Sequence, residues 1–209
     1  MLFVNRVPPN VRGAYRRDAL SGILFAVTMG LTGPFFAVIA RERLKASALE
    51  ISIITMAPVA GGILSFVWVS IMAGRPKMPF ATWSWVVGRA LLIAMLFADT
   101  ARSFVVITAM FWLICSIAGP AYSALMKEIY PDGDRGRLMG YARVGIMVAM
   151  IVVSGIAGPL LHLVSYRYIF PIAGLFGIAS ALVFNAIPVS EDSADSNLSL
   201  GELARSAVL

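Results

Sequence analysis

Few side chains in this sequence of 209 residues have the chemistry needed for catalysis or for metal binding. The sequence has one cysteine, Cys115, and one histidine, His162, which are too few soft ligands for a zinc site of the usual kind. A serine nucleophile needs a base beside it, and Ser65 and Ser154 have no evident base. We therefore expect no catalytic residue, no metal site, no cofactor and no enzyme activity.

Small polar and aromatic side chains beside glycine-proline pairs could instead contact a solute. Gly33-Pro34 and Gly119-Pro120 each interrupt an apolar run. Pro34 removes a backbone donor and disturbs the carbonyl one turn earlier, near Gly30. Transporters break membrane helices in this way to line a cavity with freed backbone groups, although membrane helices also tolerate proline for packing alone. The candidate cavity residues are Thr28, Thr32, Phe36, Trp112, Ser116 and Tyr122.

Arg89 is the only charged residue well inside an apolar run. A guanidinium is costly at such a depth. We expect it either to snorkel toward the cytoplasm, near Trp83 and Trp85, or to act as a gate or as a partner for substrate charge. Asp18 and Glu128 are acids that could pair with it. No carboxylate lies deep in any run, so a carboxylate proton relay is unsupported, whereas an anionic solute could use Arg89 if its side chain faces the cavity.

The elements that must position these residues are six membrane-spanning helices. Apolar residues make up 59% of the sequence and charged residues 13%, and the mean hydropathy is +0.85, which leaves too little polar surface for a soluble protein. A helix needs about 20 apolar residues to cross a bilayer. The qualifying stretches are residues 19–40, 51–73, 80–98, 104–126, 144–164 and 168–189. The formal charge of +6 lies mainly between these runs, which favours bilayer loops over nucleic-acid binding.

Charge and composition also divide the chain and orient it. Most of the 17 lysine and arginine residues fall on one side of the predicted spans, which places the N- and C-termini in the cytoplasm. We expect a cytoplasmic N-terminal segment at residues 1–17, a six-helix transmembrane bundle at 18–189, and a polar cytoplasmic tail or interdomain linker at 190–209. The expected location is the plasma membrane, as a multi-pass protein.

The two glycine-proline pairs lie at similar depth in the first and fourth spans, which cross the bilayer in opposite directions. This is typical of two inverted three-helix repeats, so the predicted fold class is an all-α membrane protein of six transmembrane helices in two such repeats. Between the fourth and fifth spans, residues 131–134 predict a tight turn. Arg135 and Arg137 could then meet Glu128 or the carbonyl ends of neighbouring helices.

The stretch GPAYSALMKEIYPDGDRGRLMG, residues 119–140, resembles the recurring end of helix four in the major facilitator superfamily, with its proline, its RGR and its following glycine. Residues 73–77, AGRPK, occupy the place of the superfamily signature between helices two and three, without its aspartate. Gly158-Pro159 is similar to the glycine-proline element of antiporter members in helix five. The expected helix breaks are Gly33, Pro34, Gly119, Pro120, Gly158 and Pro159. The expected gating or conformational residues are Arg75, Lys77, Arg89, Glu128, Arg135 and Arg137.

Residues 15–190 therefore resemble the N-terminal half of a major facilitator superfamily transporter. The resemblance implies transport of a small solute by alternating access, in which two six-helix bundles move around a site at their interface. Only one bundle is present, so the chain is expected to be truncated or to pair with itself or with a separate half. The expected partners are a small-molecule solute, the lipid bilayer and a second six-helix half, with no nucleic acid. The alternative is a non-transporting subunit that assembles with another membrane protein.

Overall fold

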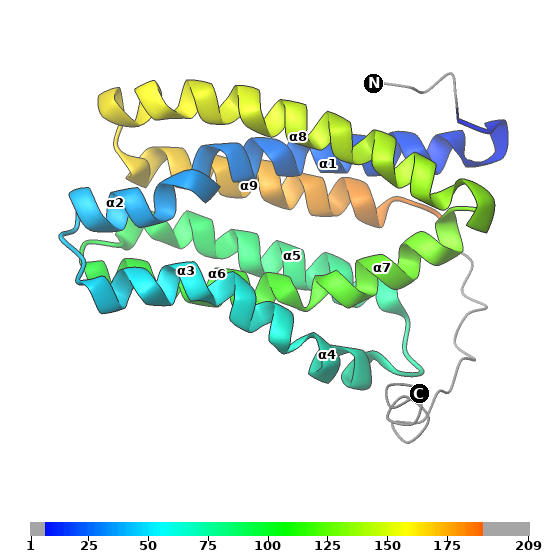
Figure 1. Ribbon diagram of the computed structural model, residues 1–209, viewed down its shortest axis with the longest axis horizontal. Coiled ribbons are helices and arrows are strands. Elements are labelled where there is room, and N and C mark those ends of the chain that lie inside the picture. The colour runs from blue at the N-terminus through cyan, green and yellow to red at the C-terminus, as the bar shows by residue number, and fades with distance from the viewer. Residues whose placement is uncertain (1–6, 190–209) are drawn as a thin grey trace.

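The computed structural model describes residues 7–189, and this part of the chain consists of helices and their connections (Figure 1). The helices are α1 (Arg12–Thr32), α2 (Phe36–Glu42), α3 (Ala48–Ile63), α4 (Ser65–Met72), α5 (Lys77–Ala94), α6 (Ala101–Ser116), α7 (Ala118–Ile129), α8 (Asp132–Leu163) and α9 (Tyr166–Asn185). Short 3₁₀ turns are η2 (Pro9–Val11), η3 (Gly33–Phe35) and η4 (Met95–Phe97). The tail expected at residues 190–209 lies outside the described residues.

The six predicted spans are confirmed. Five helical stretches are long and apolar enough to cross a membrane, and α3 with α4, bent by 41°, supplies the sixth. Below, span 1 is α1 with α2, span 2 is α3 with α4, span 3 is α5, span 4 is α6 with α7, span 5 is α8 and span 6 is α9. Capping boxes begin two of them: Ser47 and Glu50 exchange hydrogen bonds at the start of α3, and Thr100 and Ser103 do so at α6.

The packing of the spans has the symmetry of two repeats. Span 1 packs against spans 5 and 6, span 4 packs against spans 2 and 3, and span 3 packs against span 6. Exchanging spans 1, 2 and 3 with spans 4, 5 and 6 leaves this set of neighbours unchanged. Figure 1 shows the result as two layers, with α8, α1 and α9 in one and α3, α5, α6 and α7 in the other. The predicted fold class is therefore confirmed.

The connection between spans 4 and 5 differs from the expected loop, because it is largely helical. The tight turn predicted at residues 131–134 is the first turn of α8, where the amides of Asp134 and Arg135 donate to the Pro131 carbonyl at 3.0 and 2.9 Å. Two acids in this first turn, Asp132 and Asp134, favour a helix start because they face the positive end of the helix dipole. Helix α8 thus begins at Asp132, twelve residues before the apolar run at 144–164.

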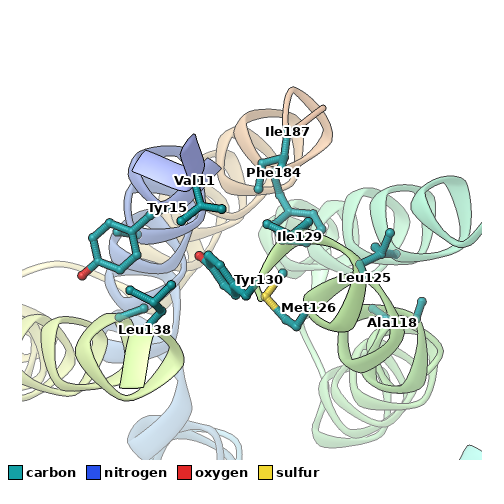
Figure 2. Packing of buried hydrophobic residues seen from close by; sticks show 14 of the residues in the cluster. Val11, Tyr15, Ala118, Leu125, Met126, Ile129, Tyr130, Leu138, Phe184 and Ile187 are labelled. Atoms are coloured by element: carbon teal, nitrogen blue, oxygen red, sulfur yellow. The ribbon is translucent and has the colours of Figure 1, made fainter. Parts of the chain in front are cut away.

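Two apolar clusters hold the helices together at their two ends. The tyrosine cluster includes Tyr15, Leu125, Tyr130 and Leu138 and joins the start of α1 to the end of α7 and the start of α8 (Figure 2). The phenylalanine cluster, at the other end, contains Phe36, Phe104, Phe111, Tyr166 and Phe170. The aromatic rings of the phenylalanine cluster meet mostly edge to face, which is a favoured geometry for aromatic pairs.

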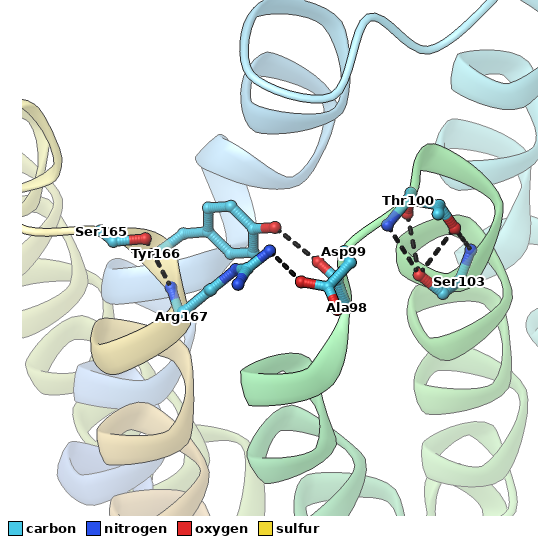
Figure 3. A network of polar contacts seen from close by, with 7 residues as sticks. All are labelled: Ala98, Asp99, Thr100, Ser103, Ser165, Tyr166 and Arg167. Atoms are coloured by element: carbon cyan, nitrogen blue, oxygen red, sulfur yellow. Dashed lines mark hydrogen bonds and ion pairs between the residues drawn. The ribbon is translucent and has the colours of Figure 1, made fainter.

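Polar contacts tie the chain at the phenylalanine-cluster end (Figure 3). The Tyr166 hydroxyl donates to the Ala98 carbonyl at 2.7 Å, and Arg167 pairs with Asp99. The connection after span 3 is thereby fixed to the start of span 6, one repeat to the other.

Candidate solute-binding cavity

A cavity of about 1370 Å³ lies between spans 1, 2, 3 and 4. Its walls are mostly apolar, and include Phe25 and Met29 of α1 with Phe111 and Trp112 of α6. The charged side chains that line it are Lys77, Arg89, Lys127 and Glu128. Arg89 stands apart from the other three, which lie at the first residue of α5 or in the last turn of α7. The cavity therefore combines an apolar surface with one deep cation.

The break in span 4 opens onto this cavity. Helix α6 ends at Ser116 and α7 starts at Ala118, immediately before the glycine-proline pair. Gly119 and Pro120 both line the cavity, and a Cβ on Gly119 would meet nothing within 4 Å. Trp68 of α4 donates to the Ser116 hydroxyl at 3.1 Å, which ties span 2 to the break.

The break in span 1, unlike that in span 4, does not line the cavity, and it lies against α8. Gly33 and Pro34 form the turn η3, and Pro34 cannot donate to the carbonyl of Gly30 one turn earlier. Ser154 of α8 donates to that carbonyl at 3.2 Å. Each break thus accepts a hydrogen bond from the second span of the opposite repeat. Span 5 supplies the donor for the break in span 1, and span 2 supplies the donor for the break in span 4. The sequence correctly located the affected carbonyl, but not the serine that satisfies it.

The helix break expected at Gly158-Pro159 is not present in the structure. Helix α8 continues through Pro159 to Leu163. A Cβ on Gly155 or Gly158 would meet nothing within 4 Å, whereas the side chain of Ala157 between them is buried. The missing amide of Pro159 costs one hydrogen bond, and the last turn tolerates that loss.

The predicted cavity residues separate into two groups. Trp112 and Ser116 line the cavity. Thr28, Thr32 and Phe36 do not, because they are buried between helices. Thr28 donates to the Ala173 carbonyl at 2.9 Å, Thr32 to the Thr28 carbonyl at 2.8 Å, and Phe36 lies in the phenylalanine cluster.

Tyr122 also points away from the cavity, toward a buried acid. Asp18 of α1 is 4% exposed and accepts hydrogen bonds from Tyr130 at 2.8 Å and Tyr122 at 3.4 Å. Burial, together with the Asp18 carboxylate, raises the pKa of Tyr130 above its usual value, so this hydroxyl keeps its proton and donates. Both tyrosines are more than 100 positions from Asp18 in the sequence, so no local sequence pattern predicts these hydrogen bonds.

Arg89 does not snorkel. Its side chain is 2% exposed, and Nη1 donates to the Gly177 carbonyl of α9 at 2.6 Å. The guanidinium carbon lies 5.1 Å from the centre of the Phe25 ring and 5.0 Å from that of Trp85. Neither Asp18 nor Glu128 pairs with it.

The other predicted gating residues lie at the end of the bundle that carries the tyrosine cluster. Lys77 and Glu128 line the mouth of the cavity, with Gly74 beside them at a φ of 68°, where a side chain would be strained. Arg75 is exposed. Arg135 donates to the Lys127 carbonyl at 3.3 Å and pairs with Asp132, and Arg137 pairs with Asp134 at 2.8 Å. The expected contact with a helix carbonyl end thus exists, whereas Glu128 is not the partner.

A profile of the Major Facilitator Superfamily matches residues 19–208. The chain belongs to the Major Facilitator Superfamily. No curated protein matches the sequence with significant similarity. Members of this superfamily are membrane transporters for small molecules, so the apolar helices of this chain belong to an integral, multi-pass membrane protein.

Proposed function

We propose that this Major Facilitator Superfamily chain is one half of a secondary transporter that moves a small solute by alternating access. The observation that carries the proposal is the cavity of about 1370 Å³ beside the break in span 4. A broken helix beside a cavity supplies backbone groups to a passing solute, and it is a point at which a span can bend. The sparse polar lining favours amphipathic or uncharged solutes. We place the protein in the plasma membrane with its termini in the cytoplasm.

The proposal includes a second six-helix half, because a site at the interface of two bundles needs both of them. Large apolar side chains remain exposed along span 2 and span 5, among them Ile63, Phe66, Ile151 and Ile156, and either lipid or a second half would cover them. The mass of the detergent-solubilised particle, from light scattering with the detergent contribution subtracted, distinguishes a second copy of this chain from another source of the second half. A twofold mass supports two copies of this chain, and a monomer supports a separate or covalently continuous half.

Solute flux in reconstituted vesicles tests the transport function. We expect uptake of at least one member of a broad solute panel above the leak of empty vesicles. Gly119→Trp should abolish that uptake, because the indole would occupy the cavity at a position with no neighbouring atoms within 4 Å. The control is Gly13→Trp at the start of α1, where a Cβ is equally unobstructed but lies away from the cavity. Flux that never exceeds the leak, with folded protein and the second half supplied, would contradict the proposal and favour a non-transporting subunit.

A further inference from the structure

Arg89 is a cation deep in the bundle with no anionic partner among residues 7–189. It lies twelve residues into α5, about 18 Å along the helix axis from Lys77. The ion pairs in the described part of the chain join other residues, Arg135 to Asp132, Arg137 to Asp134 and Arg167 to Asp99. A charge at this depth is expensive, and such residues face one another or a cavity when they are retained. The charge of Arg89 therefore needs an explanation.

The hydrogen bonds of Arg89 leave most of its donors unused. A guanidinium has five N–H donors. One nitrogen, Nη1, donates to the neutral carbonyl of Gly177, while Nε is buried and has no partner. The contact with Gly177 joins α5 to α9, but a neutral amide could make the same contact. A structural role thus accounts for one hydrogen bond and leaves the buried Nε without an acceptor.

The guanidinium lies beside the cavity rather than behind it. Phe25, Trp85, Arg89 and Cys115 all line the same cavity. The rings of Phe25 and Trp85 flank the guanidinium carbon at 5.1 and 5.0 Å, a cation–π arrangement that limits where its plane can point. An arginine held by two aromatic rings is pre-organised, so less freedom is lost when it binds an anion.

We propose that Arg89 is the binding site for the carboxylate of a small organic monoanion whose apolar body occupies the cavity. A carboxylate matches the planar donor pattern of arginine and neutralises its single charge. A monoanion fits better than a dianion, because the other cations of the cavity, Lys77 and Lys127, lie near its mouth. Aromatic walls at Phe111 and Trp112 suit an aromatic or long aliphatic body. This inference rests on the proposed transport function, for which it names the substrate class.

Equilibrium binding of radiolabelled 1-naphthoate to the full chain in nanodiscs of zwitterionic lipid tests the site, with 1-naphthamide as the neutral analogue of the same shape. We expect saturable binding of naphthoate that unlabelled naphthoate displaces at a concentration at least tenfold below that of naphthamide. Arg89→Gln should weaken naphthoate binding at least tenfold, and Arg89→Lys should restore part of it. Arg102→Gln removes an exposed arginine outside the cavity and should change binding less than twofold.

Three results would overturn the proposal: equal displacement by naphthoate and naphthamide, unchanged binding in folded Arg89→Gln, or no saturable binding of naphthoate to the wild-type chain. The comparison of the two probes on the wild-type chain stands even if Arg89→Gln does not fold. The assay also separates this inference from transport. Naphthoate binding through Arg89 without flux of any solute, with the second half supplied, would refute transport and retain the site, whereas flux of neutral solutes without naphthoate binding would refute the site alone.

Discussion

Gly174→Ala tests the close contact between spans 3 and 6. A Cβ on Gly174 would lie 2.9 Å from the backbone oxygen of Arg89, 3.1 Å from Cγ1 of Ile93 and 3.2 Å from Cβ of Leu92. The nearest atom belongs to the backbone of α5, so no side-chain rotation can relieve the overlap. The two helices must separate along their shared face, and small residues at such interfaces are what let membrane helices approach closely.

The expected loss can be worked from two opposing effects. Forcing an extra methyl group into a packed interface costs about 1–3 kcal/mol. Replacing glycine by alanine inside a helix gains up to about 1 kcal/mol. Gly155→Ala in α8 carries only the second effect, because nothing lies within 4 Å of its added Cβ. The free energy of unfolding of Gly174→Ala should therefore fall about 1–3 kcal/mol below that of Gly155→Ala.

Unfolding by titration with SDS in mixed micelles, followed by tryptophan fluorescence and far-ultraviolet circular dichroism, measures this difference. Equal stability of the two variants would refute the reasoning, since it would mean that α5 and α9 do not approach as closely at Gly174 as the structure has them.

Two further substitutions probe hydrogen bonds between distant helices by the same unfolding assay. Tyr130→Phe removes the 2.8 Å donor to the buried Asp18 carboxylate and should cost about 1–3 kcal/mol, and a change below about 0.5 kcal/mol would show that this bond contributes little. Ser180→Ala removes one of two reciprocal bonds between α9 and α1, in which each hydroxyl of Ser21 and Ser180 donates to the other residue's carbonyl at 2.9 and 2.8 Å. We expect a loss of about 0.6–1.7 kcal/mol, and a variant as stable as the wild-type chain would contradict the assignment.

The spans were predictable because membrane insertion depends on properties that are local in sequence. Apolar runs of about 20 residues are read directly from the sequence, and so are prolines that deprive a helix of a donor. The carbonyl of Gly30 could be named in advance for this reason. Helix starts were less predictable. The charged residues that made 132–143 resemble a loop belong to the first turns of α8, where Asp132 and Asp134 stabilise the N-terminus.

The site residues were harder to predict, because their surroundings come from other spans. Thr28 has the side chain expected of a cavity residue, yet α9 lies against it and supplies the Ala173 carbonyl. The direction of Arg89 depends on the carbonyl of Gly177, 88 positions away, and on two aromatic rings. A helical period defines a face of a helix, but it does not identify which neighbour that face meets.

Thiol accessibility at the break of span 4 tests most directly whether the cavity is a water-filled route for a solute. In a Cys115→Ser background, the chain in lipid vesicles would carry either Gly119→Cys or Gly155→Cys and be exposed to a charged, membrane-impermeant thiol reagent. Both positions have open space for a Cβ, but only Gly119 lines the cavity. The account predicts that Gly119→Cys reacts with the reagent and Gly155→Cys does not. An inert Gly119→Cys in folded protein, or equal labelling of both positions, would contradict it.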